Sequence, residues 1–325
     1  MPLAVMCREF GPPESFSLEE FEPGPLGTNE VRIAVKVAGI SFVDVLATSG
    51  NYQHETPRPF IPGSEGAGII DAIGSNVSGL EPGDRVFFSA GQGIFCQLNN
   101  FDASKVSKVP QGVSLETAAV IIANYQTALY ALADRGRAQP GETLLVLGAA
   151  GGTGFAAVQV GKHLGLRVIA SASSADKRQV ALDGGADAVV ETGAADWRAQ
   201  VKAANGGKPI DLVFDPVGGD LTELALRNLG YDGRHLIVGF PAGIASVPTN
   251  LPLLKSASIV GVHLGDALIR RPEKAIAIRK QVLELAAQGV LSPAIAARYP
   301  ITDFVSAMEA AFSGKLAGRV LLTME

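Results

Sequence analysis

The chain has 325 residues, of which 47% are apolar and 18% charged, so it is long enough for about two globular domains and too apolar for a disordered segment. A formal net charge of −5, without runs of Lys or Arg, excludes a nucleic-acid backbone or an anionic membrane as the main partner. No apolar run approaches the roughly 20 residues of a membrane span, and two widely separated cysteines suit a reducing compartment, so we expect a soluble cytoplasmic protein.

The first third of the chain alternates short β-type runs with glycine and proline. Examples are the runs at 31–37 and 68–74, which are rich in Val, Ile and Ala. We therefore expect a β-rich first domain over residues 1–122.

From residue 123 onward, strand and helix patterns alternate. Six strands are predicted, at 143–148, 167–172, 187–191, 211–217, 234–239 and 258–263. Strands separated by helices form a doubly wound parallel sheet, which predicts an α/β domain over 123–265. Helical periodicity then covers 272–288 and 302–314, and the β-type run at 318–323 is expected to return the segment 266–325 to the first domain.

A glycine-dense turn follows the first of these six strands. The spacing is Gly148-x-x-Gly151-x-x-Gly154, and an apolar helix face comes after it. Because glycine lacks a Cβ, it permits tight turns and lets backbone N–H groups approach a pyrophosphate at the positive end of a helix. The strand-turn-helix context favours a dinucleotide site over a purely structural turn.

The identity of the dinucleotide depends on the end of the second strand, where an acid would bind the ribose 2′-OH of NAD. This chain has Ser173 there, followed by the cations Lys177 and Arg178, which suit a 2′-phosphate and favour NADPH. The alternative is that Ser174 or Asp176 caps the next helix and that the two cations are only solvated.

Five motifs in chain order carry a family resemblance. They are AGISFVD at 38–44 with SGNY at 49–52, PGSEGAG at 62–68, AAGGTG at 149–154, DPVGG at 215–219 and GF at 239–240. With them the whole chain resembles the medium-chain dehydrogenase/reductase superfamily, and within it the zinc-free quinone oxidoreductases of the zeta-crystallin type. The resemblance implies a GroES-like β-rich catalytic domain and a Rossmann domain that enclose a cleft, with NADPH as the cofactor.

The resemblance also implies which residues bind the cofactor. The glycine turn would hold the pyrophosphate, Lys177 matches the family's binding lysine, and the last two motifs would lie beside the nicotinamide. The expected cofactor-binding residues are Asn124, Thr127, Gly151, Gly152, Thr153, Gly154, Ser173, Lys177, Val217, Gly239, Phe240 and, as a weaker cationic candidate, Arg319.

A catalytic zinc needs about three protein ligands, usually from Cys, His and Asp or Glu. The zinc-dependent relatives carry a Cys at the position of Ser41 and a His at that of Ser64, and neither serine is a suitable zinc ligand. The four histidines stand far apart in the sequence, so we predict no metal. Without a Lewis acid, reduction of an electron-poor conjugated acceptor is favoured over alcohol oxidation.

Tyr52 is the first candidate for a catalytic hydrogen-bond donor, because a phenol stays protonated at neutral pH and the family counterpart lines the substrate cleft. The alternative is a half-buried packing tyrosine. Ser41 and Asp44 are further catalytic candidates, but their spacing also fits a capping box at the start of a short helix over 42–48.

These features predict an NADPH-dependent, zinc-independent reductase that transfers hydride to a quinone-type acceptor. One alternative is a reductase of the C=C bond of an enone or enoyl thioester. Another is a catalytically idle NADPH-binding protein with a structural or regulatory role. The predicted last strand, 258–263, would leave an exposed apolar sheet edge, which predicts a homodimer.

Overall fold

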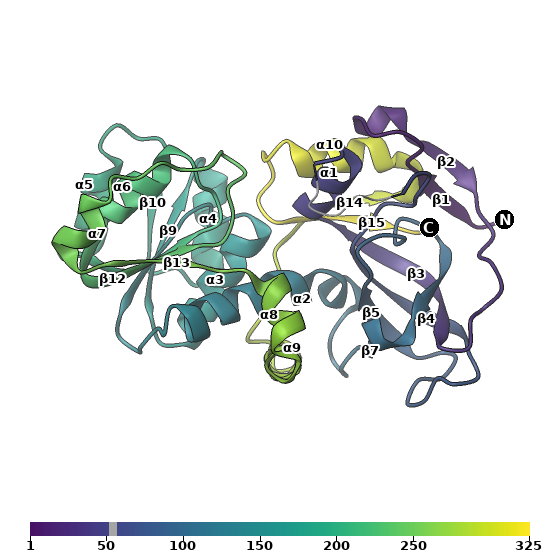
Figure 1. Ribbon diagram of the computed structural model, residues 1–325. Helices are drawn as coiled ribbons and strands as arrows, with labels where there is room; N and C mark the ends of the chain where they lie inside the picture. The colour runs from purple at the N-terminus through teal and green to yellow at the C-terminus, as the bar shows by residue number, and fades with distance from the viewer. Residues whose placement is uncertain (52–56) are drawn as a thin grey trace. The chain divides into compact units, whose positions relative to one another are not determined.

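Two units divide the chain in this computed structural model, which describes residues 1–51 and 57–325 (Figure 1). Unit 1 comprises Met1–Ile121 and Ile295–Glu325, and unit 2 comprises Ile122–Ala294. Residues 266–294 therefore belong to unit 2, whereas we expected them in the segment 266–325 that returns to the first domain.

Unit 1 is built on a seven-stranded sheet with the strand order β14-β15-β3-β4-β5-β7, in which β6 also pairs with β3. All pairs are antiparallel except β14 with β15. The strands of unit 1 are β1 (Leu3–Met6), β2 (Ser17–Glu20), β3 (Glu30–Ile40), β4 (Glu65–Ile73), β5 (Arg85–Ser89), β6 (Leu98–Asp102), β7 (Val106–Lys108), β14 (Ile295–Pro300) and β15 (Arg319–Thr323). Its helices are α1 (Phe42–Thr48) and α10 (Phe304–Phe312), and α2 (Leu115–Leu129) continues from unit 1 into unit 2.

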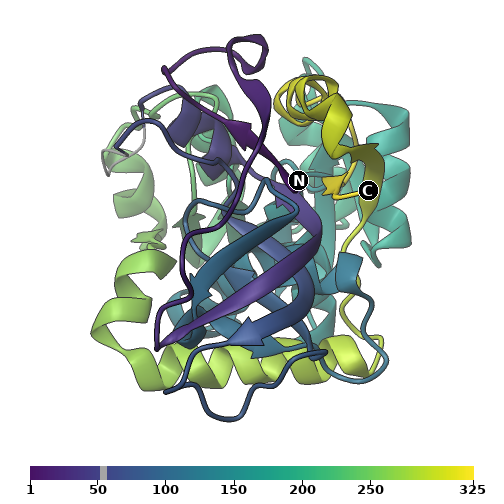
Figure 2. The same cartoon turned by 90° about the vertical axis from the view of Figure 1, so that its right-hand side faces the viewer.

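Strand β3 shows why this sequence forms a sheet with one face in the core. Val31, Ile33 and Val35 are buried and alternate with partly exposed residues, which is the period of two expected for a strand. The curved strands around it are visible in Figure 2. The chain end is bound into the same sheet, because β15 pairs with β3 and places Val320 opposite Ile40.

Unit 2 contains the predicted parallel sheet of six strands, in the order β10-β9-β8-β11-β12-β13. The strands are β8 (Thr143–Val146), β9 (Arg167–Ala172), β10 (Ala188–Glu191), β11 (Ile210–Asp215), β12 (Leu229–Ile237) and β13 (Ser258–Gly261). The helices that follow α2 are a π-helical turn (Tyr130–Arg135), α3 (Gly152–His163), α4 (Ala175–Asp183), α5 (Trp197–Ala204), α6 (Asp220–Asn228), α7 (Asn250–Lys255), α8 (Leu264–Arg270) and α9 (Pro272–Ala287). This is the Rossmann arrangement expected from the sequence.

The strand order reverses beside β8, which lies between β9 and β11. Ligands of open parallel sheets bind beyond the carboxyl ends of the strands at such a reversal. The core of this unit is formed by buried aliphatic side chains of the central strands, including Leu145 and Val213, with Trp197 of α5. The carboxyl ends of β8, β9, β11 and β12 are therefore the place to search for a nucleotide site.

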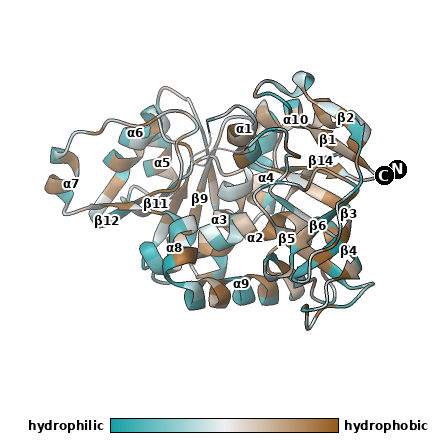
Figure 3. Ribbon diagram, turned by 45° about the vertical axis from the view of Figure 1, so that its right-hand side comes forward, coloured by the Kyte–Doolittle hydropathy of each residue, from teal (hydrophilic) through white to brown (hydrophobic). Residues whose placement is uncertain are grey.

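Helices α8 and α9 explain why the segment after β13 stays with unit 2. Lys274 forms an ion pair with Asp134, and the Gln126 side chain donates to the main-chain oxygen of Ala275 at 3.3 Å. Helix α9 alternates hydrophobic and hydrophilic residues along its length, as Figure 3 shows. In the part of the chain that the structure describes, no helix combines the length and the apolar character needed to cross a membrane.

Candidate functional site

The N-terminus of α3 follows closely on the central strand β8. Gly148 has a φ of 58°, a left-handed conformation that favours glycine, and its carbonyl oxygen accepts from the Gly151 N–H at 3.0 Å. A Cβ on Gly154 would fall well inside contact distance of that carbonyl, so turn and helix pack as closely as glycine allows. Gly152 begins the helix, and the first-turn N–H groups of a helix have no acceptor within it. The predicted residues Gly151, Gly152 and Gly154 thus lie at one helix N-terminus, where a phosphate is readily held.

Asn124 lies against this turn. The Thr153 hydroxyl donates to the side-chain oxygen of Asn124 at 2.8 Å, which ties α2 to the first turn of α3. Thr127 is three residues further along α2, and its hydroxyl donates to the main-chain oxygen of Ala123 at 2.7 Å. The structure therefore groups Asn124 and Thr153 with the glycine turn, whereas the hydroxyl hydrogen of Thr127 is used within its own helix.

The carboxyl end of β9 carries hydroxyl groups and cations. Ser173 is exposed, and Ser174 caps α4 by accepting from the Lys177 N–H at 3.3 Å. The Arg178 guanidinium donates to the main-chain oxygen of Ala172, the last residue of β9, at 3.4 Å. The capping that we kept as an alternative is present, and it places Lys177 in the helix turn that begins where the strand ends. A ribose phosphate would bind at this position.

Two loops meet at the carboxyl ends of β11 and β12. The Gly239 N–H donates to the main-chain oxygen of Asp215 at 3.3 Å, and the Ala242 N–H donates to that of Val217 at 2.9 Å. Phe240, between these two contacts, is 57% exposed. The three residues that the resemblance places beside the nicotinamide, Val217, Gly239 and Phe240, are thus brought together.

Asp215 holds this loop pair through a network that sequence reasoning missed. Its Oδ1 accepts from the N–H groups of Val217 and Gly218 at 3.0 and 2.8 Å. Its Oδ2 accepts from the Thr222 hydroxyl at 2.7 Å and lies 2.9 Å from Nε2 of His235. Burial raises the pKa of Asp215, but the hydrogen bonds outweigh burial and the pKa lies below its ordinary value. The available signal was a pair of polar residues, Asp215 and His235, near the carboxyl ends of two neighbouring strands.

In unit 1, Ser41 and Asp44 form the capping box at the start of α1. One carboxylate oxygen of Asp44 accepts from the main-chain N–H of Ser41 at 2.7 Å and from its hydroxyl at 2.8 Å. The Ser41 hydroxyl also lies 3.1 Å from the Ser64 hydroxyl. Burial raises the pKa of Asp44 to about 6, although the hydrogen bonds from Ser41 oppose it. The capping role and a buried, protonatable carboxyl therefore coexist in one residue.

Arg319 is placed differently from our expectation. Its guanidinium pairs with the Glu65 carboxylate and donates to the main-chain oxygen of Ile40 at 3.0 Å, all within the sheet of unit 1. Both charged side chains are buried. A guanidinium that neutralises a buried carboxylate is engaged inside its own unit, which speaks against the cofactor-binding role that we expected for Arg319.

Two further predictions concern Tyr52 and metal binding. Tyr52 lies outside the described residues. Among the residues that the structure describes, no group of three or more His, Cys, Asp or Glu side chains is arranged to hold a metal ion. The two serines at the zinc-ligand positions of the zinc-dependent relatives, Ser41 and Ser64, contact each other through their hydroxyl groups.

A GroES-like β unit and a Rossmann unit with a glycine turn at the start of α3 define a medium-chain dehydrogenase/reductase. Comparisons with known families agree with this class. Residues 27–128 match the family described as alcohol dehydrogenase GroES-like domain, and residues 152–283 match the family described as zinc-binding dehydrogenase.

Individual relatives narrow the class. The chain is 36% identical to quinone oxidoreductase-like protein 2 of Bos taurus over 99% of this chain and 92% of the relative. It is 30% identical to the quinone oxidoreductase of Rattus norvegicus over 98% and 97%. The structure of Escherichia coli quinone oxidoreductase complexed with NADPH superposes with a TM-score of 0.88 at 30% identity, covering 99% of both chains. The chain belongs to the quinone oxidoreductase family, which confirms the resemblance seen in the sequence, and it is an oxidoreductase of the medium-chain type.

Proposed function

We propose that this chain is an NADPH-dependent, zinc-independent reductase that transfers hydride to a quinone-type acceptor. The observation on which this proposal depends is the N-terminus of α3, where Gly148, Gly151 and Gly154 shape a turn for a pyrophosphate. A side chain at Gly154 would collide with the backbone of the turn, so the close packing of α3 on the turn requires glycine at this position.

NADPH fits the residues at the end of β9 better than NADH. Ser173 and the cations Lys177 and Arg178 stand where NAD-binding proteins of this fold carry an acid for the ribose 2′-OH. Arg178 donates to the end of β9 and lies 3.9 Å from the Glu191 carboxylate, so its charge is partly compensated, and Lys177 supplies a second cation near the expected 2′-phosphate position. The family relative from Escherichia coli, whose structure contains NADPH, supports the same assignment.

The remaining cofactor residues would position the nicotinamide end. When bound, NADPH supplies the hydride. Val217, Gly239 and Phe240 would border its reducing ring, while Asn124 and Thr153 would hold the turn that carries the diphosphate. The buried carboxylate of Asp215 keeps Val217 in place by accepting its N–H at 3.0 Å.

Reduction of a quinone to a hydroquinone consumes a proton in addition to the hydride. We assign its supply to Asp44 and Ser41 of unit 1. Burial raises the pKa of Asp44 to about 6, so this carboxyl exchanges a proton near neutrality. Ser41 connects Asp44 to Ser64 through hydroxyl contacts of 2.8 and 3.1 Å, which form a short path for that proton. Tyr52 stays our prediction for a direct hydrogen-bond donor to the acceptor oxygen.

Steady-state assays test the proposal. The purified chain is supplied with NADPH or NADH and with matched panels of 1,4-quinones and enones, with and without a zinc chelator. We expect quinone reduction that prefers NADPH and is unaffected by the chelator. Faster turnover of enones would favour the C=C reductase, and tight NADPH binding without turnover of either panel would favour the idle binding protein. A Tyr52→Phe variant should lower kcat in the first two cases and be silent in the third.

Strand β13 supports the proposal of a homodimer. It is the last strand of the unit 2 sheet, and Ile259 is 45% exposed there. An apolar edge with unpaired main-chain groups favours pairing with a second copy. Sedimentation velocity should show a dimer, and an Ile259→Lys variant should shift it to a monomer; a monomeric parent chain would contradict the proposal. The buried free thiols of Cys7 and Cys96 fit the reducing cytoplasm that we propose as its location.

A further inference from the structure

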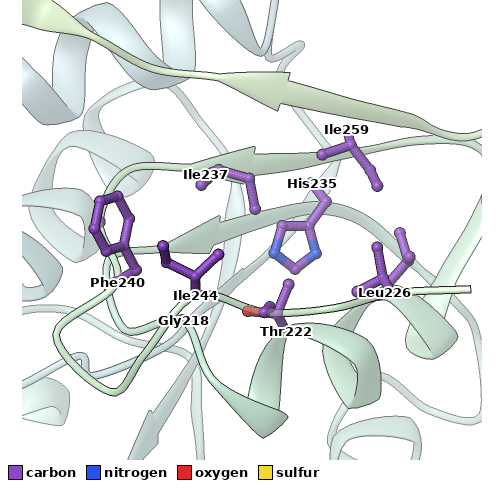
Figure 4. A pocket seen from close by; sticks show the side chains of 11 residues that line it. Gly218, Thr222, Leu226, His235, Ile237, Phe240, Ile244 and Ile259 are labelled. Atoms are coloured by element: carbon purple, nitrogen blue, oxygen red, sulfur yellow. The ribbon is translucent and has the colours of Figure 1, made fainter.

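A small pocket opens on unit 2 beside His235 (Figure 4). Its volume is about 170 Å³. Apolar side chains form most of its wall: Leu226 of α6, Ile237 of β12, Ile259 of β13, and Phe240, Ile244 and Val247 from the loop that follows β12. Figure 4 shows the imidazole of His235 lying among them.

His235 supplies a polar atom without a partner at this pocket. The side chain is fully buried, and Nδ1 has no hydrogen-bond partner among the residues that the structure describes. The other ring nitrogen, Nε2, lies 2.9 Å from Oδ2 of Asp215. A carboxylate only accepts hydrogen bonds, so Nε2 carries the proton of that contact, and in the neutral ring Nδ1 is left as an acceptor. A buried acceptor is costly to leave unmet.

The second polar side chain of the wall has no hydrogen left to donate. Thr222 donates its hydroxyl to Asp215 at 2.7 Å, although its oxygen can still accept. The pocket therefore combines an apolar wall with two side-chain acceptors, and of these only Nδ1 of His235 makes no hydrogen bond among the described residues. If His235 served only to hold Asp215, neither an open cavity beside it nor an unmet Nδ1 would be required.

We propose that this pocket binds a small phenol-like molecule, an aromatic ring with one hydroxyl group that donates to Nδ1 of His235. The volume of the pocket suits such a ligand, because an apolar cavity of roughly 150 Å³ holds benzene. The pocket adjoins the proposed nicotinamide site, since Gly239 and Phe240 belong to both, but phenol binding itself requires neither NADPH nor an acceptor. His235 is linked to the loop that carries Val217, because Asp215 contacts His235 and also accepts hydrogen bonds from the N–H groups of Val217 and Gly218.

Equilibrium dialysis of the full chain without cofactor tests this proposal, with phenol and toluene as the two probes. They have similar size, but toluene lacks the hydroxyl. We expect one saturable phenol site per chain and toluene binding that is weaker by about 2- to 10-fold, the range of one net hydrogen bond. His235→Phe keeps an aromatic ring in the wall but removes Nδ1, so phenol and toluene should then bind with equal affinity.

A second pair of variants keeps the test decisive if His235→Phe does not fold. Ala245 lines the pocket, whereas its neighbour Ser246 is exposed and lies outside the lining. Ala245→Phe should fill the pocket and abolish phenol binding, and Ser246→Phe, which adds the same ring to the same loop, should not. Absence of saturable phenol binding, equal affinity for phenol and toluene, or unchanged binding by Ala245→Phe would overturn the proposal. None of these results depends on NADPH turnover.

Discussion

Replacing Asp44 by asparagine removes a buried carboxyl and keeps the size of the side chain. The Asp44 carboxyl is 2% exposed, and burial raises its pKa from 3.8 to about 6. The asparagine oxygen still accepts the hydrogen bond from the Ser41 N–H that caps α1. The substitution therefore changes mainly the titration of one buried group.

The sign and size of the change in stability follow from the pKa of Asp44 in the folded chain and its pKa in the unfolded chain. Below a pH of about 4 the carboxyl is protonated in both the folded and the unfolded chain, and its contribution to stability is fully present. As the pH rises through about 6 the folded protein must release a proton that the unfolded chain has already lost, so the contribution disappears. A difference of about two pKa units corresponds to about 3 kcal/mol in total, of which about 1.4 kcal/mol is expressed between about pH 8 and about pH 5.

Urea unfolding followed by circular dichroism, at several pH values between about 5 and 8, measures this difference directly. The free energy of unfolding of the parent chain should rise relative to Asp44→Asn as the pH falls. Asp71→Asn is the matched control, because Asp71 is an exposed carboxyl on β4 of the same unit. An offset between parent and Asp44→Asn that stays constant over this pH range would refute the raised pKa, and with it the assignment of Asp44 as a proton source.

Three further substitutions test other parts of the molecule. Gly154→Ala should weaken NADPH binding at least tenfold in calorimetry and lower stability by about 1–3 kcal/mol, because its Cβ meets backbone; Gly24→Ala, where a Cβ has open space, should do neither. Lys177→Ala should raise the KM for NADPH by about 10- to 100-fold and leave that for NADH unchanged. Lys208→Ala, just before the amino end of β11 and so away from the carboxyl ends of the strands, should change neither constant. Arg319→Met should destabilise unit 1 by about 3–5 kcal/mol in urea unfolding, because it leaves a buried carboxylate unpaired; a cofactor-binding arginine would instead lower NADPH affinity at little cost in stability.

The regular elements of both units were predictable because their periodicity is local. Five of the six strands of the unit 2 sheet lie within two residues of their predicted bounds, since each contains a short apolar run. Strand β12 begins five residues earlier than predicted, because its first half is rich in glycine and polar residues. The placement of 266–294 was not predictable in this way. It depends on contacts such as those of Lys274 with Asp134 and of Ala275 with Gln126, which join residues about 140 to 150 positions apart in the chain.

The residues of the candidate site divide in the same way, into those that a local sequence pattern predicts and those that depend on long-range contacts. Gly151, Gly152 and Gly154 could be proposed from the sequence because the turn and helix start that they form are one continuous segment. Network partners far apart in sequence were hidden: the register of β11 and β12 brings His235 to Asp215, and the pairing of β15 with β3 helps to bring Arg319 to Glu65. An isolated arginine near the C-terminus therefore looked like a phosphate ligand, although its charge compensates a carboxylate on β4.

The polar cluster of unit 1 gives a physical reason for the zinc-independent reduction that we propose. Ser41 and Ser64 are neutral hydroxyls in contact with each other, and neither offers the thiolate or imidazole that zinc prefers. Asp44 is occupied by the N–H and O–H of Ser41, and Glu65 is paired with Arg319, which leaves one glutamate oxygen without a partner among the described residues. Two carboxylates fall short of the three ligands that a catalytic zinc usually takes. What the cluster offers instead is hydroxyl donors next to a carboxyl that titrates near neutrality, and a quinone, which is already electron-poor, needs a proton at its oxygen more than a Lewis acid.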